Sequence, residues 1–102
     1  MATKYHNISG ELTQELLAVG GGIKVSKISL TNIHVDTKCT VDLYIEKKLT
    51  GRFYLLKGVE LPIGATLIYD SIEFSNANSE FGLYIKLTKS ASETPTVDVI
   101  IS

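Results

Sequence analysis

The stretch AVGGGIKVSK, residues 18–27, places three consecutive glycines just before a lysine, a combination that can hold phosphate groups. A phosphate-binding Walker loop has the pattern G-x-x-x-x-G-K-[ST] and opens a helix, whose N-terminal N–H groups bind the anion. Here Gly20–Gly22 instead lead into an apolar segment rich in β-branched residues, and Lys24 falls on a predicted strand. We therefore predict that Gly20–Gly22 form a turn or loop with at least one positive φ and no phosphate contact.

Nucleophiles and metal ligands are few in this sequence. His6 and His34 are the two histidines and Cys39 is the single cysteine, so a thiolate metal site and an intrachain disulfide are both excluded. His34 is predicted to be a surface or hydrogen-bonding residue, with a pairing to Asp36 as an alternative, and Cys39 is predicted to be an inert core thiol. The acidic residues lack the spacing of a calcium loop. We expect no catalytic residue, metal or cofactor, and therefore no enzyme.

Length and composition indicate one ordinary globular domain over residues 1–102, with residues 1–19 as a possible N-terminal arm or edge segment. The net charge is −1 and 44% of the residues are hydrophobic. Basic residues are not clustered, and no apolar run approaches the roughly 20 residues that span a bilayer. We expect neither nucleic acid nor membrane as a partner, and folding in a reducing cytoplasm.

Three segments alternate apolar and polar residues with a period of two, which is typical of strands that bury one face. They are CTVDLYIE (39–46), EFGLYIKLT (80–88) and TVDVIIS (96–102). Weaker strand predictions fall on KYHNIS (4–9), RFYLLKGVEL (52–61) and TLIYDSIEF (66–74), and ELTQELLAV (11–19) fits either a strand or one short helix.

Bulge and turn signals connect these segments. IKVSKISLTN (23–32) changes its apolar parity, which predicts a β-bulge near Ser26 and Lys27. KKLTG (47–51) has hairpin length, with Gly51 available for a positive φ. LPIG (61–64) fits a type I turn with Pro62 at the second position and Gly64 at the fourth. The expected fold is an all-β, antiparallel β-sandwich of about eight strands, jelly-roll-like.

Three residues project from the polar faces of predicted strands and are candidates for contact with a partner. Tyr44 and Tyr84 offer flat rings with polar tips, and Ile100 is an apolar residue on the outward parity of the last strand. Partly covered tyrosines on an outer sheet face are also common in proteins without a partner there, so both interpretations stay open.

The motifs around residues 20–70 resemble small β-sandwich structural proteins of tailed bacteriophages, especially contractile-tailed phages of marine cyanobacteria. In that family a Gly-containing turn leads to an apolar strand ending near L-T-N, followed by a V-x-L-Y-I-like strand and an L-P-x-G-x-T-L turn. The matching positions are Leu30, Thr31, Asn32, Val41, Leu43, Tyr44, Ile45, Leu61, Pro62, Gly64, Thr66 and Leu67. The match covers about half of the chain and carries no catalytic residue.

The resemblance implies a non-enzymatic virion component that binds other virion proteins, such as a major capsid, neck or tail protein, and copies of itself. A capsid decoration, or cement, protein is the first expectation, with a neck, tail or baseplate component as the alternative. A carbohydrate-binding module is the alternative from another class, because jelly rolls often bind sugars on exposed aromatic faces. The expected location is the virion, after folding in the cytoplasm of the bacterial host.

Overall fold

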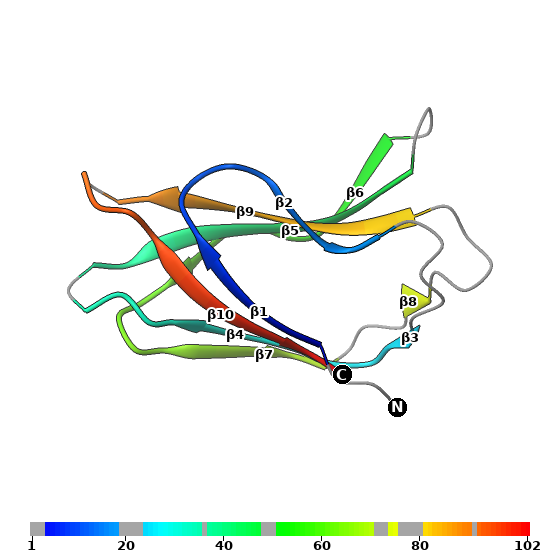
Figure 1. Ribbon diagram of the computed structural model, residues 1–102, viewed down its shortest axis with the longest axis horizontal. Coiled ribbons are helices and arrows are strands. Elements are labelled where there is room, and N and C mark those ends of the chain that lie inside the picture. Colours follow the sequence, from blue (N-terminus) through cyan, green and yellow to red (C-terminus); the bar gives the residue numbers. More distant parts are fainter. Residues whose placement is uncertain are drawn as a thin grey trace.

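The computed structural model describes residues 4–18, 24–35, 37–47, 51–70, 74–75, 81–90 and 92–102, and these ranges contain ten β-strands (Figure 1). One four-stranded sheet, called sheet 1 here, has the order β1 (Lys4–Ser9), β10 (Thr96–Ile101), β4 (Ile28–Asn32) and β7 (Thr66–Tyr69). Sheet 2 has the order β2 (Gln14–Leu17), β9 (Phe81–Lys89), β5 (Cys39–Lys47) and β6 (Gly51–Leu61). A short ribbon pairs β3 (Lys24–Val25) with β8 (Phe74–Ser75).

The strand pairing follows one nested pattern from the middle of the chain to its ends. β5 pairs with β6, β4 with β7, β3 with β8, β2 with β9 and β1 with β10, always antiparallel. The chain is thus one long antiparallel ribbon, and two further pairings, β10 with β4 and β5 with β9, roll that ribbon into two sheets. This is the architecture of a jelly roll. The predicted all-β, antiparallel sandwich is confirmed.

The core lies between the two sheets and consists of the apolar residues of the alternating strands. In β5 the residues Cys39, Val41 and Leu43 are buried, with exposed fractions of 2%, 0% and 0%. The inward residues of β9 and β10 are buried to the same extent: Leu83, Ile85, Leu87, Val97, Val99 and Ile101. The predicted period-two facing is therefore confirmed, and so is the core position of Cys39. Burial raises the pKa of this thiol, with a smaller contribution from the charge of Glu93.

The predicted bulge lies where the parity of the sequence changes. The backbone N–H groups of Ser26 and Lys27 both donate to the carbonyl oxygen of Ser102, at 2.9 and 3.0 Å. Ser26 and Lys27 therefore both face the single residue Ser102, and two residues opposite one is the defining feature of a β-bulge. The extra residue allows Val25 and Ile28, three positions apart, both to be fully buried. β3 and β4 flank this bulge and belong to the ribbon and to sheet 1 respectively.

The turn near LPIG differs from the prediction. The N–H of Ala65 donates to the carbonyl of Pro62 at 3.1 Å, so the turn begins at Pro62 and Gly64 is its third residue. Gly64 has φ 69°, the positive value that a type II turn needs at this position. The predicted type I turn is wrong because the β4–β7 ladder extends one residue pair beyond Thr31 and Thr66. The N–H of Asn32 donates to the carbonyl of Ala65, and this additional ladder bond shifts the turn by one residue.

The remaining local predictions have mixed outcomes. Gln14–Leu17 form a strand rather than a helix, and Gly51 has φ 122° at the start of β6. Gly20–Gly22, and with them the predicted positive φ, lie outside the described residues. β1 and β2, from the N-terminal segment, each form an edge strand, one on either sheet. The described ranges contain no helix long and apolar enough to cross a membrane.

Candidate interaction surfaces

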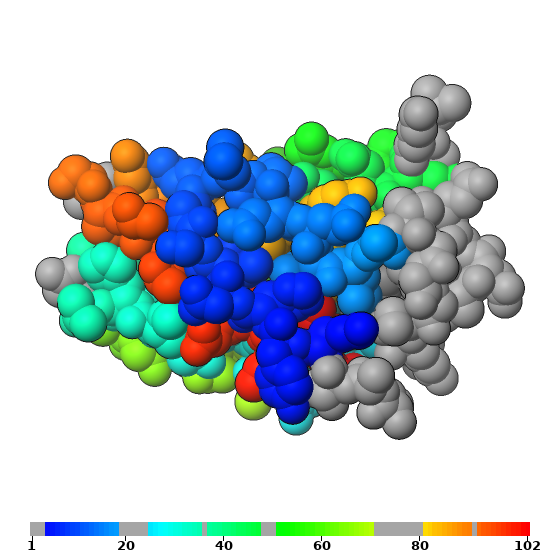
Figure 2. Space-filling view, viewed as in Figure 1, coloured from blue at the N-terminus to red at the C-terminus, as the bar shows by residue number. Residues whose placement is uncertain are grey.

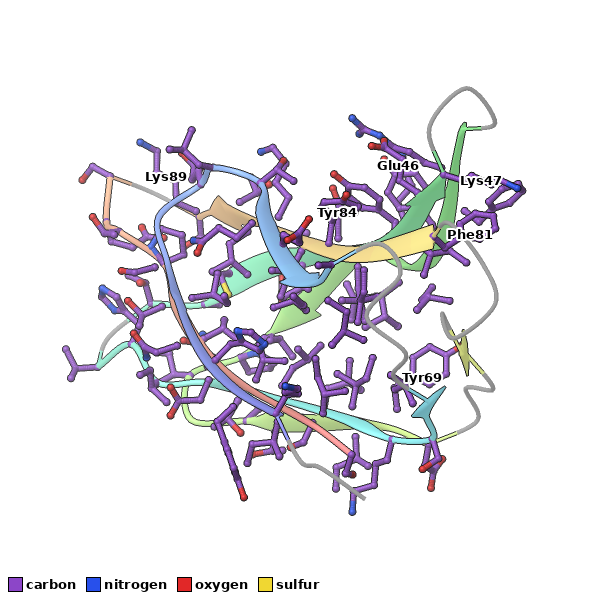
Figure 3. All side chains as sticks on the ribbon, turned by 45° about the vertical axis from the view of Figure 1, so that its right-hand side comes forward. Glu46, Lys47, Tyr69, Phe81, Tyr84 and Lys89 are labelled. Atoms are coloured by element: carbon purple, nitrogen blue, oxygen red, sulfur yellow. The ribbon has the colours of Figure 1, made fainter. Side chains whose placement is uncertain are left out.

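The outer face of sheet 2 carries a row of aromatic side chains across its strands. Strand register places Glu15, Tyr84, Tyr44 and Tyr54 side by side on β2, β9, β5 and β6. The Tyr44 and Tyr84 rings stack with centroids 5.7 Å apart, and Tyr44 and Tyr54 lie 5.3 Å apart in a tilted arrangement. Figure 3 shows Tyr84 on the side of sheet 2 that faces away from sheet 1. Two of the predicted contact residues are therefore direct neighbours.

Tyr44 is nevertheless almost inaccessible, with an exposed fraction of 2%. Its neighbours cover it: the two flanking tyrosine rings, and the guanidinium of Arg52, which lies 4.8 Å from the ring centroid. The Arg52 side chain also donates to Glu46 at 2.7 Å, and this hydrogen bond is the main reason why the pKa of Arg52 is raised. Tyr54 and Tyr84, rather than Tyr44, are the rings that a molecule approaching this face would meet.

Gly82 determines where the Tyr84 ring can lie. A Cβ atom at position 82 would be 2.9 Å from Tyr84 Oη and 3.1 Å from two ring carbons, so the tyrosine occupies the space that glycine leaves. Burial raises the pKa of Tyr84, followed by the charges of Glu15 and Glu46. The G-x-Y spacing on one strand parity is a sequence signal for this close packing.

Ile100 lies on the opposite side of the molecule, on the outer face of sheet 1. Register aligns it with Tyr5 on β1, Ser29 on β4 and Ile68 on β7. Tyr5, Ile100 and Ile68 are 73%, 41% and 55% exposed and make this row mainly apolar, with Ser29 between Ile100 and Ile68. The three predicted contact residues therefore do not form one surface. Tyr5 and Ile68 were missed because a single strand does not reveal which residues flank it.

The next row on sheet 1 is polar and satisfied by its own hydrogen bonds. Asn7 Nδ2 donates to Asp98 Oδ1 at 2.7 Å, and the hydroxyl oxygens of Thr31 and Thr66 are 2.8 Å apart. Among the paired residues on this face Asp98 is the one charged group, whereas sheet 2 presents Glu15, Asp42, Glu46, Arg52 and Lys86. Because interface cores are depleted in charge, sheet 1 has the more interface-like composition.

A shallow depression of about 300 Å³ runs along β1 and β10. Tyr5 and Ile100 line it on one side and Asn7 and Asp98 on the other, with His6 and Val99 between them. The described residues show no group of three or more His, Cys, Asp or Glu side chains that could hold a metal ion.

The two turn motifs of the sequence meet at one end of the sandwich, around Asn32. This side chain is 0% exposed, and its Nδ2 donates to the carbonyls of Thr37 and Leu61, both at 3.0 Å. Its Oδ1 accepts from the His34 N–H at 3.0 Å. Nδ1 of the His34 ring lies 2.9 Å from Thr37 Oγ1, which confirms a hydrogen-bonding histidine, while Asp36 lies outside the described residues. L-T-N and L-P-x-G are thus parts of one structural corner.

Comparison with known proteins identifies the fold but no family. No protein-family model matches the chain, and no curated protein matches its sequence. A chain of the cyanophage Pam1 capsid asymmetric unit superposes with a TM-score of 0.57 at 13% identity, over 98% of this chain and 81% of that chain. The Yersinia pseudotuberculosis-derived mitogen YPM gives 0.54 at 17% identity, over 99% of this chain and 83% of that one.

A third solved structure, from the Gt strain of infectious bursal disease virus, also gives a TM-score of 0.54, at 9% identity. The alignment covers 99% of this chain and 30% of that longer one. The same sandwich thus recurs in chains from two virus structures and in a bacterial mitogen, and at these identities the likeness is one of fold. The chain has a jelly-roll sandwich fold that also occurs in chains of these two virus structures and in the mitogen.

Proposed function

We propose that this protein is a structural subunit of a tailed-phage virion, and specifically a decoration protein that binds the outside of the capsid shell. The observation that carries the proposal is the structural match to a chain from the cyanophage Pam1 capsid asymmetric unit, which covers 98% of this chain and 81% of that chain. The motifs that resemble tailed-phage structural proteins support the same role independently of that superposition.

The placement of those motifs also supports a role in building structure. The matched residues Asn32, Pro62 and Gly64 meet in the corner around the buried Asn32 side chain, where they fix how β4 and β6 end and how β7 begins. The proposed function needs stable surfaces rather than reacting groups, so the role is non-enzymatic. The partners are the capsid shell protein and copies of this chain, and the location is the virion after folding in the host cytoplasm.

The outer face of sheet 1 is the surface that we assign to the shell. Its Tyr5, Ile100 and Ile68 row is exposed and apolar, and the polar row beside it is hydrogen-bonded within the sheet. A contact over this face would remove apolar surface from water and leave few charges to desolvate. Tyr84 would lie on the face of sheet 2 that points away from the shell.

Quantitative mass spectrometry of purified virions of the phage that encodes this chain tests the proposal. A decoration protein is expected at a copy number comparable to that of the major capsid protein, and a map of the particle should place the sandwich on the shell. A few copies per particle would support the neck, tail or baseplate alternative. Absence from the particle would contradict any virion role.

Surface variants extend the test to the contact itself. Ile100→Asp should reduce incorporation into virions, because it would place a charge in the apolar row, whereas Tyr54→Ala on sheet 2 should leave incorporation unchanged. Glycan binding that is lost with Tyr54→Ala or Tyr84→Ala would instead support the carbohydrate-binding alternative.

A further inference from the structure

The four edge strands of the sandwich differ in how well they are protected against pairing with another strand. Unpaired edges join other chains readily unless shortness, bulges or charges prevent it. β7 has only four residues, and β2 has four with a register shift between Glu15 and Leu17. β6 is long, but it contains two register shifts and carries the exposed charges of Arg52 and Lys57. These three edges are protected.

β1 has the fewest of these protections, and Lys4 at its first position is its one charged side chain. Its six residues pair with β10 in unbroken register from Lys4 opposite Ile101 to Ser9 opposite Thr96. The strand contains neither proline nor a bulge, and Tyr5 beside its open edge is 73% exposed. In Figure 2 the β1 and β2 residues, in blue, lie at the front of the molecule, with no described segment over them. β1 is the edge best suited to receive a further strand.

The hydrogen-bond phase shows which β1 groups are available. Ser102 and Lys27 exchange both backbone hydrogen bonds, at 2.9 and 3.0 Å, so the even-numbered residues of β10 bond to β4. Its odd-numbered residues therefore bond to the even-numbered residues of β1, because bonding alternates along an antiparallel strand. Gly10, which donates to Pro95 at 3.0 Å, continues this phase.

The backbone groups of Tyr5, Asn7 and Ser9 consequently point away from β10, toward the open edge. The Ser9 carbonyl already accepts from Gln14 Nε2 at 3.1 Å. Within the described part of the chain, the outward N–H and C=O groups of Tyr5 and Asn7 have no partner. Together with the N–H of Ser9, for which the described residues also offer no partner, three donors and two acceptors thus lie along this edge.

We propose that two copies of this chain pair through β1, antiparallel, about a two-fold axis at His6, so that the two copies of sheet 1 become one eight-stranded sheet. Tyr5 of each copy then lies opposite Asn7 of the other, and their outward groups make four hydrogen bonds. An axis at Asn7 would instead place Tyr5 opposite Ser9, where the Tyr5 N–H would have to share the Ser9 carbonyl with Gln14 Nε2. The register at His6 therefore pairs both outward groups of Tyr5 and Asn7 without sharing an acceptor, and it leaves only the Ser9 N–H at the end of the edge outside the pairing.

The side chains are compatible with this arrangement. Tyr5 and Asn7 project to the same outer face, so each Tyr5 ring lies beside the Asn7 amide of the second copy. Each half of the enlarged sheet keeps its own row of Tyr5, Ile100 and Ile68. Lys4 is the one charged side chain of β1, and the two copies of it lie four residues apart along the strand, about 13 Å. That distance exceeds the screening length of physiological salt, about 8 Å.

The inference rests on the proposed role in assembly, because it names the contact through which copies of the chain associate. Its test uses the purified full-length chain in solution, so that it can fail or succeed independently of the virion. Asn7→Pro removes an N–H that points outward and has no partner among the described residues of the same chain, and edge strands tolerate proline at such positions. Asn7→Ala is the matched control, since both variants lose the hydrogen bond to Asp98 and only the proline loses the N–H.

Sedimentation equilibrium over a concentration series should show a monomer–dimer equilibrium for the wild type and for Asn7→Ala. Asn7→Pro should lower the association constant about tenfold or more, because two of the four hydrogen bonds are lost. Circular dichroism and thermal unfolding establish that each variant is folded. Wild-type protein that is monomeric throughout, or Asn7→Pro dimers as tight as those of Asn7→Ala, would overturn the proposal.

A crosslink tests the register. The Cα atoms of a hydrogen-bonded antiparallel pair are about 5.5 Å apart, which a disulfide can bridge. The double variant Tyr5→Cys, Asn7→Cys should form covalent dimers on oxidation, and the two single variants should form few. Equal crosslinking by Asn7→Cys alone would overturn the register at His6. Dimers that form in solution while virions lack the protein would contradict the virion role and not the β1 contact.

Discussion

Asn32 joins the L-T-N and L-P-x-G motifs in one corner of the sandwich. It is a fully buried polar side chain, and its three amide hydrogen bonds join backbone groups of the following loop, at His34 and Thr37, to the end of β6 at Leu61. We expect Asn32→Asp to lower the free energy of unfolding by about 3 kcal/mol or more, because a buried carboxylate would then face the carbonyls of Thr37 and Leu61. Chemical denaturation measures this loss.

Thr66→Val is the control for that variant, because it removes the exposed hydroxyl pair with Thr31 in the same region. Its cost should stay below about 1 kcal/mol. An Asn32→Asp protein as stable as the Thr66→Val protein would contradict the structural role of this corner.

Because of Cys39, the free energy of unfolding should decrease at alkaline pH. Burial raises its pKa in the folded state, so the folded protein holds the thiol proton more tightly than the unfolded chain does. The stabilising contribution is complete below the pKa of an exposed thiol, about 8.5, and is lost progressively as the pH rises above that value. The free energy of unfolding should fall by up to about 1.4 kcal/mol per pH unit from this group.

Cys39→Val removes the ionisable group and keeps a small apolar side chain in the core. Between pH 8 and 10 the wild-type stability should therefore fall more steeply than that of the variant, as measured by denaturant titration at each pH. Parallel stability curves for the two proteins would show that the pKa of the thiol does not differ between the folded and unfolded states.

Among the structural elements, the alternating strands could be predicted from sequence and the environment of their outer residues could not. Val41 and Leu43 alternate with polar residues, and this pattern fixes which face of β5 is buried. It does not show that β6 contains two extra residues opposite Val41–Tyr44, and that shift brings Tyr54 beside Tyr44. Tyr44 was therefore placed on the correct face, but its burial by neighbouring side chains was missed.

The turn after β6 shows the same limit. Pro62 and Gly64 mark a turn in any sequence. Which of them starts the turn depends on the hydrogen bond between Asn32 and Ala65, which joins residues that are far apart in the chain. Local residue preferences gave the place of the turn, and only the strand register gave its type.

The contact between Gly82 and Tyr84 can be tested on β9 itself. Gly82→Ala should displace the Tyr84 ring from its stack on Tyr44 and lower the free energy of unfolding by about 1 kcal/mol. In a Tyr84→Ala background the same change should be neutral or stabilising, because the ring that it displaces is absent and alanine is less flexible than glycine when unfolded. The double-mutant cycle, read by denaturation and near-UV circular dichroism, measures this coupling. Additive effects of the two substitutions would mean that the contact between position 82 and the Tyr84 ring does not affect stability.

At the scale of the whole molecule, the nested pairing orders the contacts by sequence separation. β5 and β6 flank a connection of three residues, whereas the outermost pair joins Lys4 to Ile101. The entropy of closing a loop grows with its length, so the central hairpin forms at the lowest cost. Sequence patterns gave the strands, but not this order, because alternation says nothing about which strand pairs with which.

The same order predicts how core mutations divide between folding and unfolding. Val41 in β5 and Val99 in β10 are both fully buried, so replacing either with alanine removes the same groups from the core, at a cost of about 2 kcal/mol. If β5 and β6 form before the ends of the chain join, Val41→Ala should slow folding about fivefold, and Val99→Ala should mainly accelerate unfolding. Stopped-flow refolding and unfolding over a denaturant series separate the two rates. Slower folding of Val99→Ala than of Val41→Ala would mean that the chain ends pair early, despite the long loop that this closes.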